Sequence, residues 1–283
     1  MILLTGATGT VGRELAAQLL EGNEKIRVLV RDPAKAEHLK GRAEIVQGDL
    51  EQADTLAAAM KGADHVFLLT VDQATATDAN VIAAAKAAGV AHVVKLSTSF
   101  VANDPQTAIG AWHAEKEQLL KDSGLAWTML RPGGFMSNSL QWVGSIKSQG
   151  TVYSAMGSAK SAPIDPADIA AVAKAALTKP GHEGKAYELS GGELLTQAEQ
   201  VEILSKAIGK PLKTVEVTVA AAVEGMRASR RMPPKLVDAM GEMLETIRAG
   251  KLFRPATDTV EKITGRKPAT YESWCLAHRA AFL

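Results

Sequence analysis

A glycine-rich segment directly after an apolar run constrains this chain more than any other feature. Residues 5–12 read Thr-Gly-Ala-Thr-Gly-Thr-Val-Gly and follow the apolar run Met1–Leu4. This pattern predicts a tight turn that joins a buried strand to a helix. In such a turn Gly6 permits the bend, Gly9 lets the backbone approach a ligand, and Gly12 lets the helix pack closely on the strand.

The helix that follows this turn offers a binding site for an anion. The N–H groups of its first turn have no partners within the helix, and its dipole places positive charge there. A glycine triplet between a strand and a helix therefore predicts a dinucleotide whose pyrophosphate lies at the helix start. A turn with a purely structural role is the alternative. The residues expected to contact the pyrophosphate are Gly6, Thr8, Gly9, Thr10, Val11 and Gly12.

The end of the second predicted strand, Ile26–Val30, indicates which dinucleotide binds. A carboxylate at this point binds a ribose 2′-hydroxyl, whereas an arginine binds a 2′-phosphate. Arg31 directly follows the strand and Lys35 lies about one helical turn further, so both can bind a phosphate. Asp32 precedes Pro33, a pair that is typical of a helix N-cap followed by proline at the first position. We therefore expect NADP(H), with a merely solvated Arg31 as the alternative.

Composition excludes several other classes of protein. The 283 residues suffice for one large or two small domains. The 32 basic and 31 acidic residues nearly cancel and form no long basic block, so we expect no nucleic-acid or membrane partner. Cys275 is the only cysteine and the histidines lack ligand spacing, so we expect no disulfide and no metal site. The glycine motif begins almost at Met1, and no apolar run could span a bilayer; a cytoplasmic monomer or homodimer is the expectation.

Strand-like and helix-like segments alternate over the first half of the chain. Apolar strand candidates are Ile2–Thr5, Ile26–Val30, Ala43–Gln47, His65–Thr70, His92–Ser97 and Trp127–Leu130. Helix-like segments between them are Leu56–Met60, Asp78–Ala88 and Trp112–Lys121. Continuous apolar strands separated by helices are typical of a parallel sheet covered on both faces. The expected fold is therefore α/β, a doubly wound parallel sheet of the Rossmann type.

The rest of the chain is mainly helical in pattern. The predicted elements are helices at Pro166–Leu177, Thr196–Ile208, Val217–Arg227 and Pro234–Ala249, and a strand at Ala186–Leu189. We expect residues 1–131 plus about 164–190 to form the NADP(H)-binding domain. Residues from about 132–163 plus 191–283 are expected to form a smaller, mainly helical substrate region, interleaved with it.

The other strand ends complete the expected cofactor site. The remaining contacts predicted there are Asp49, Leu50, Leu69, Thr70, Ser97, Pro132 and Gly133. The carboxylate of Asp49 can meet the adenine amino group, or it can cap a helix instead. Leu69 and Thr70 lie at the sheet edge where the rest of the cofactor must lie. Pro132 and Gly133 are expected to form the wall behind the nicotinamide ring.

The order of these motifs is similar to that of a known family. Besides the opening glycines, residues 48–50 (Gly-Asp-Leu), 95–99 (Lys-Leu-Ser-Thr-Ser), 117–133 and 164–170 carry the resemblance. On these residues the chain resembles the NmrA-like group of atypical short-chain dehydrogenase/reductase proteins. The resemblance covers about the first 190 residues well. It implies either an NADPH-dependent reductase of quinones or dyes, or a redox-sensing regulator that binds the cofactor without turnover.

One expected feature of the wider family is missing. Its members typically protonate the nascent alkoxide with a tyrosine whose pKa is lowered by a lysine four residues later. The three tyrosines of this chain are followed, four residues on, by glycine, glycine and cysteine. Alignment on Glu117 places Ile109 at the tyrosine position and His113 at the lysine position. A shifted register places His113 and Glu117 there, so the pair is absent either way.

This absence limits the chemistry that the chain can perform. An aliphatic alkoxide is about as basic as hydroxide (water pKa about 15.7), so reduction of a simple ketone needs a proton donor. A reduced quinone leaves a phenolate with a pKa of about 10, which water can protonate. The sequence therefore argues against alcohol dehydrogenation and epimerisation. It favours hydride delivery to a quinone-like or conjugated acceptor; a non-catalytic NADP(H) sensor acting through a protein partner is the alternative.

His113 and Ser97 are the remaining candidates for catalysis. Imidazole exchanges a proton near neutral pH, and Glu117 at i+4 can pair with it; a surface histidine stabilised by Glu117 is the alternative. Ser97, at the end of the fifth strand, can bind a substrate oxygen or cap a turn. Residues expected to line a cleft for a small aromatic or conjugated substrate are Phe135, Asn138, Trp142 and Tyr153. Packing in the core is the alternative for such side chains.

Overall fold

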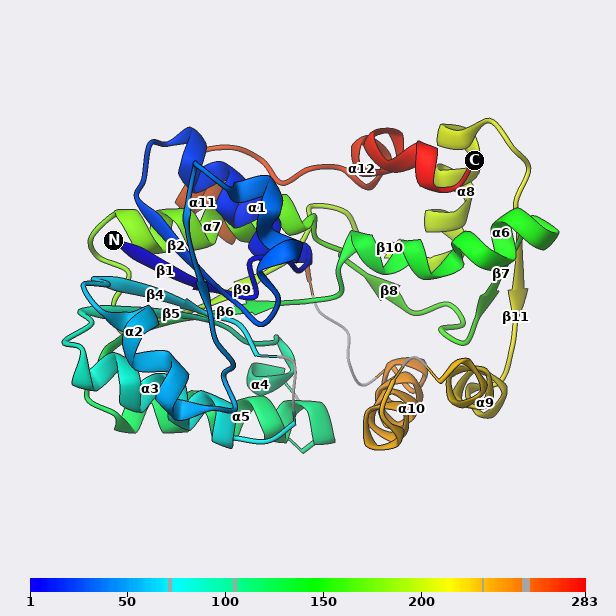
Figure 1. Ribbon diagram of the computed structural model, residues 1–283. Helices are drawn as coiled ribbons and strands as arrows, with labels where there is room; N and C mark the ends of the chain where they lie inside the picture. The colour runs from blue at the N-terminus through cyan, green and yellow to red at the C-terminus, as the bar shows by residue number, and fades with distance from the viewer. Residues whose placement is uncertain (71–72, 104–105, 231, 251–254) are drawn as a thin grey trace.

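A parallel sheet forms the centre of the molecule (Figure 1). The computed structural model describes residues 1–70, 73–103, 106–230, 232–250 and 255–283, and within them the sheet has seven strands. The strand order is β3-β2-β1-β4-β5-β6-β9, so the direction of winding reverses between β1 and β4. The strands are β1 (Ile2–Thr5), β2 (Ile26–Val30), β3 (Glu44–Gln47), β4 (His65–Leu68), β5 (His92–Leu96), β6 (Ala126–Pro132) and β9 (Lys185–Leu189). The predicted doubly wound parallel α/β fold is confirmed.

The inner strands are mainly apolar because helices cover both faces of the sheet, whereas the edge strands β3 and β9 are partly exposed. Every residue of β1 and β2 is buried, so their sequences are continuous rather than alternating. On one face α1 (Thr10–Glu21), α7 (Pro166–Thr178) and α11 (Thr259–Thr264) pack together. On the other face lie α2 (Leu56–Met60), α3 (Ala76–Ala87) and α5 (Ala108–Asp122), as Figure 1 shows.

Side-chain caps begin the helices at the positions that the sequence indicates. The carboxylate of Asp32 accepts a hydrogen bond from the Ala34 N–H (3.1 Å) and starts the 3₁₀ helix η1 (Pro33–Leu39). The expectation that Asp32 is an N-cap is thus confirmed. Asp165 caps α7 in the same way, by accepting from the Ala167 N–H (2.9 Å). In both cases proline follows the cap, where its missing N–H costs no helical hydrogen bond.

A second, smaller lobe holds most of the remaining elements. Its apolar cluster combines residues that are distant in sequence, with Met136, Val152, Leu204 and Trp274 among them. The elements outside the sheet and its covering helices are η2 (Ala53–Thr55), α4 (Phe100–Asn103), η3 (Met136–Trp142), α6 (Val143–Gln149), β7 (Thr151–Ser154), β8 (Lys160–Ser161), β10 (Leu195–Thr196), α8 (Gln197–Ile208), β11 (Lys213–Glu216), α9 (Val219–Ser229), α10 (Pro234–Arg248), α12 (Tyr271–His278) and η4 (Arg279–Ala281). Of these, η2 and α4 lie beside α2 and α5 at the sheet. The two short strand pairs, β7 with β11 and β8 with β10, were not predicted.

The chain passes between the sheet and this lobe more than once. It leaves the sheet after β6, returns for α7 and β9, and leaves again before α8. A parallel bridge between Phe135 and Ile164 joins the outgoing and returning segments. This path accords with the expected interleaving, while the domain boundaries themselves stay a prediction. In the described parts of the chain, no helix combines the length and the apolar character that a membrane span requires.

Replacement of Gly12 by alanine tests the packing on which the turn depends. A Cβ atom at Gly12 would lie 2.1 Å from the carbonyl oxygen of Gly6. This oxygen is a backbone atom, so the clash can be relieved only if the turn or the helix shifts. We expect Gly12→Ala to lower the free energy of unfolding by about 3 kcal/mol or more. Gly225→Ala is the matched control, because Gly225 lies inside α9 with open space around its Cβ position. That control should gain about 0.5–1 kcal/mol. Urea unfolding measures both, and equal stabilities would contradict the packing argument.

Candidate cofactor and substrate site

The glycine turn forms a cradle that fits a phosphate group. Gly6 adopts a left-handed conformation (φ 66°), and its carbonyl accepts a hydrogen bond from the Gly9 N–H (2.9 Å). Gly9 is the N-cap of α1 and has no side chain to occupy the first N–H groups of the helix. Val11 is buried in the core, so only its backbone can meet a ligand. A cavity of ≈ 420 Å³ opens beside Thr8–Thr10.

The groups predicted to bind the adenosine end lie along the edge of β2 and β3. Arg31 and Lys35 are both exposed, and the Arg31 backbone carbonyl accepts from the Gln47 side-chain amide (3.2 Å). Asp49 accepts a hydrogen bond from the Glu51 N–H (3.1 Å) and so forms a local turn, whereas the N-cap of the following η2 is Gln52 rather than Asp49. The carbonyl of Leu50 accepts from the Asn80 amide (3.0 Å).

Thr70 belongs to a buried group of charges at the end of β4. Its hydroxyl donates to Asp78 (2.8 Å) and accepts from the Lys116 ammonium (3.3 Å). Asp78 also forms ion pairs with Lys95 and with Lys116, and the side chains of Asp78 and Lys95 are fully buried. Although burial alone would raise it, the pKa of Asp78 is lowered because these two cations face it. Leu69 packs against Gly6, near the position of a Cβ atom there.

Ser97 and Glu117 form a second buried group with Arg131. The Ser97 hydroxyl donates to the Glu117 carboxylate (2.7 Å), and Arg131 donates two hydrogen bonds to the same carboxylate (2.9 and 2.6 Å). Such a bidentate pair is strong and directional. The spacing of His113 and Glu117 in the sequence suggests that these two residues pair. In the structure Glu117 is held by Ser97 and Arg131 instead. The Ser97 hydroxyl thus already donates its hydrogen to Glu117 in this structure.

His113 is held uncharged by its surroundings. Its Nδ1 atom is buried and has no hydrogen-bond partner among the described residues. Burial, followed by the nearby Lys95 and Lys116, lowers the pKa of His113 from 6.5 to about 4. His113 is thus half-buried, with its Nδ1 atom shielded from solvent, rather than a fully exposed surface histidine. At neutral pH it can offer a neutral imidazole to a ligand, but not an imidazolium acid.

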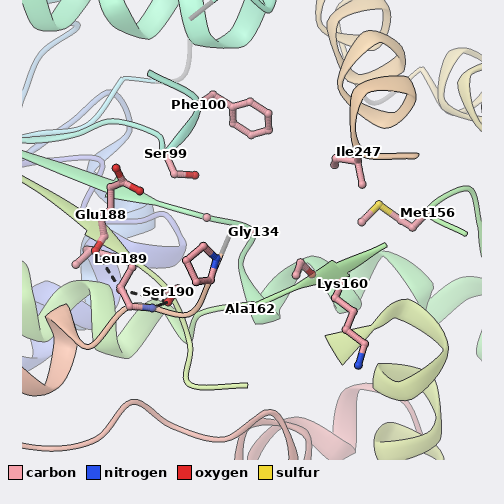
Figure 2. Close-up of a pocket in the computed structure, with 14 residues that line it drawn as sticks. Ser99, Phe100, Gly134, Met156, Lys160, Ala162, Glu188, Leu189, Ser190 and Ile247 are labelled. Atoms are coloured by element: carbon pink, nitrogen blue, oxygen red, sulfur yellow. Dashed lines mark hydrogen bonds between the residues drawn. The ribbon is translucent and has the colours of Figure 1, made fainter. Parts of the chain in front are cut away.

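A narrow apolar pocket lies at the carboxyl ends of β5, β6 and β9. Figure 2 shows its residues, and the cavity measures ≈ 110 Å³. Ser99 and Phe100 follow β5, Gly134 follows β6, and Met156 and Ile247 come from the second lobe. Figure 2 also shows the Ser99 hydroxyl directed into the space between the Phe100 ring and Gly134. The predicted wall residue Gly133 lines the same pocket.

Sequence reasoning missed Ser99, which lies two residues beyond Ser97. The Ser97 N–H donates to the Leu130 carbonyl (2.7 Å) and the Ser99 N–H to the Pro132 carbonyl (2.9 Å). These bonds continue the pairing of β5 with β6 past the formal end of β5. Extension of the predicted strand by two residues would have brought Ser99 to the edge of the sheet.

The four predicted substrate residues lie elsewhere. Phe135 packs against the core that α1 and α7 share, and Trp142 packs in the core of the second lobe. Asn138 is exposed, and Tyr153 is 48% exposed with its hydroxyl donating to the Gln149 side chain (2.6 Å). None of these four residues lines the ≈ 110 Å³ pocket, as far as the structure describes its lining. For Phe135 and Trp142, the alternative of core packing describes their positions.

Comparison with known proteins agrees with the cradle at the glycine turn. A family model described as NAD(P)H-binding matches residues 6–180. This chain belongs to that NAD(P)H-binding family. The predicted nicotinamide cofactor is thereby confirmed.

Similar proteins extend over the whole chain. A (4-alkanoyl-5-oxo-2,5-dihydrofuran-3-yl)methyl phosphate reductase of Streptomyces griseus is 42% identical over 100% of this chain and 99% of its own length. An NAD(P)H azoreductase of Xenophilus azovorans is 41% identical over 100% of this chain and 99% of its own length. The structure of an NADPH-dependent quinone oxidoreductase of Escherichia coli in complex with NADPH matches with a TM-score of 0.85 at 30% identity, covering 97% of this chain and 98% of that chain.

The fold implied by the resemblance to the NmrA-like group is also confirmed. A mutant NmrA structure matches with a TM-score of 0.79, covering 97% of this chain and 94% of that chain. At 18% identity this match concerns the fold alone.

The low pKa of His113 predicts an acid-dependent loss of stability. Folded His113 stays neutral down to about pH 4, whereas the unfolded chain takes up a proton below its ordinary pKa of 6.5. Stability from this group is therefore complete above pH 6.5 and is lost as the pH falls from 6.5 to about 4. In that window the free energy of unfolding should fall faster in the wild type than in His113→Gln, by up to about 1.4 kcal/mol per pH unit.

Urea unfolding at several pH values measures this difference. His38→Gln is the matched control, because His38 is exposed, and it should follow the wild type. Parallel pH profiles for the wild type and His113→Gln would show that burial does not hold His113 neutral.

Proposed function

We propose that this protein is an NADPH-dependent reductase that transfers a hydride to a quinone-like or otherwise conjugated acceptor. The observation that carries the proposal is the narrow apolar pocket beside Gly133 and Gly134. It lies at the carboxyl edge of the sheet, where doubly wound proteins bind their ligands. The relatives named above are reductases, and their names include a conjugated lactone phosphate, azo compounds and quinones as classes of acceptor.

The pocket suits a flat acceptor. Gly134 has nothing within 4 Å of its Cβ position, so the backbone there leaves room for a ring. Phe100, Met156 and Ile247 offer apolar surface around that space. When bound, the cofactor supplies the hydride. Ser99 then donates a hydrogen bond to the acceptor oxygen on which negative charge develops, and Ser97 with Glu117 keeps this edge of the sheet in place.

The proton is not supplied by a strong acid of the protein. His113 is neutral near pH 7 because of its low pKa, and no tyrosine has a lysine four residues later. A hydroxyl such as that of Ser99 can stabilise a phenolate or a similar delocalised anion, and water then protonates it. A simple ketone gives a far more basic alkoxide, so its reduction should be slow here. The proposed substrates are therefore acceptors whose reduced form is a stabilised anion.

A panel of acceptors with a pocket variant tests this proposal. NADPH oxidation should proceed with quinones, enones or azo compounds and be at least tenfold slower with simple ketones, because the reduced ketone is the stronger base. Gly134→Leu should lower kcat/KM for the conjugated acceptors about tenfold or more by filling the pocket. Gly144→Leu is the control, since Gly144 also has open space at its Cβ position but lies in α6. Tight NADPH binding without turnover of any acceptor would contradict the proposal and favour a cofactor sensor.

A charge reversal tests the choice of cofactor. The proposal assigns the 2′-phosphate of NADPH to Arg31 and Lys35, which are exposed beyond the end of β2. Arg31→Glu should raise the Kd for NADPH at least about tenfold and change the Kd for NADH little, because only NADPH carries that phosphate. Arg42→Glu is the control for net charge, as Arg42 is exposed beyond η1. Equal weakening of both cofactors by Arg31→Glu would place Arg31 elsewhere.

A further inference from the structure

The C-terminal helix α12 reaches the glycine turn. The ≈ 420 Å³ cavity beside this turn is bounded by Thr8–Thr10 on one side and by Trp274 and His278 of α12 on another. Arg13 of α1 also lines it. We propose that Arg13 and His278 bind the pyrophosphate of the nicotinamide cofactor, together with the first N–H groups of α1. This inference concerns the cofactor, which the family shows, and does not depend on the proposed substrate.

Arg13 is placed for this role by the geometry of its helix. It lies one turn after the Gly9 cap, and its N–H donates to the Gly9 carbonyl (3.0 Å). Side chains on a helix lean toward its N-terminus, so the Arg13 side chain leans toward the start of α1. The residue is exposed, and its guanidinium can donate two parallel hydrogen bonds to a phosphate.

His278 is oriented by contacts within α12. Its ring stacks on the buried Trp274 ring, with centroids 4.4 Å apart and an interplanar angle of 18°. Its Nδ1 lies 2.9 Å from the Trp274 carbonyl oxygen and so donates to it, which directs Nε2 away from the helix backbone. His278 is the last residue of α12, where the helix dipole favours a cation. With Nδ1 donating to the Trp274 carbonyl, Nε2 can donate to a phosphate when both ring nitrogens carry a hydrogen.

Two acidic residues line the same cavity and oppose an anion there. Asp165 is largely committed to its own helix, because it accepts from the Ala167 N–H. Burial and the nearby Asp168 raise the pKa of Asp165. On acidification Asp165 therefore loses its negative charge at a higher pH than a free carboxyl does. Glu14 is half-buried one residue beyond Arg13. The positive charge of Arg13 offsets these two carboxylates, so its removal should directly lower the affinity for a diphosphate.

The pyrophosphate is common to NADPH and NADH, and this provides a selective test. We would measure the Kd of both cofactors by calorimetry for Arg13→Gln, His278→Gln and Arg31→Gln. Loss of one charged hydrogen bond to phosphate should weaken binding by roughly tenfold. Arg13→Gln and His278→Gln should weaken NADPH and NADH by the same factor. Arg31→Gln, by contrast, should weaken NADPH alone.

Two further variants serve as matched controls. Arg13→Lys keeps the charge and should retain most of the affinity. Arg279 is the neighbour of His278 but does not line the described part of the cavity. Arg279→Gln should therefore bind both cofactors like the wild type. Thermal unfolding without cofactor should be unchanged in all variants, which excludes a folding defect.

Unchanged Kd values in Arg13→Gln or in His278→Gln would overturn the assignment of that residue. Weakening confined to NADPH would also overturn it, since the group would then contact the 2′-phosphate. The acceptor panel is a separate measurement, so a failure of the proposed reductase activity leaves this inference intact, and the reverse also holds.

Discussion

The close approach of Gly12 to the Gly6 carbonyl is the constraint on which the site depends. With no Cβ at Gly12, α1 starts directly at the carboxyl end of β1, and Gly6 in its left-handed conformation makes the turn short enough. The free N–H groups of α1 therefore face the point where the order of strands reverses. Ligands of doubly wound sheets bind at that point. The position of the cofactor is thus set by backbone packing before any polar side chain contributes.

Buried charges fix the other side of the site. Lys95, Asp78 and Lys116 link β5, α3 and α5, while Glu117 and Arg131 link α5 to β6. A buried ion pair is weak support for overall stability, but removal of one partner costs about 3–5 kcal/mol. These groups therefore hold α5 in one position against the sheet. Together with burial, the same two lysines lower the pKa of His113. The charges that orient α5 thus also keep His113 from acting as an acid near neutral pH.

Much of the sheet and its caps could be predicted because the signals are local. Continuous apolar runs located the strands of the main sheet to within two residues, and the pair Asp32-Pro33 identified a helix start. Tertiary partners could not be predicted in this way. Glu117 had a possible partner one turn away, but Arg131 from β6 bonds it with better geometry. The exposed strand β11 has no apolar run at all, and its place is given by pairing with β7.

The second, mainly helical lobe contributes residues to both cavities beside the sheet. Met156 and Ile247 bring apolar surface to the pocket at β5 and β6, and Trp274 and His278 reach the glycine turn. Both cavities are thus bordered by residues from the second lobe. For the proposed reductase, which lacks a strong acid, the choice of acceptor takes the place of proton transfer by the protein. The second lobe can shape that choice, while the sheet positions the cofactor.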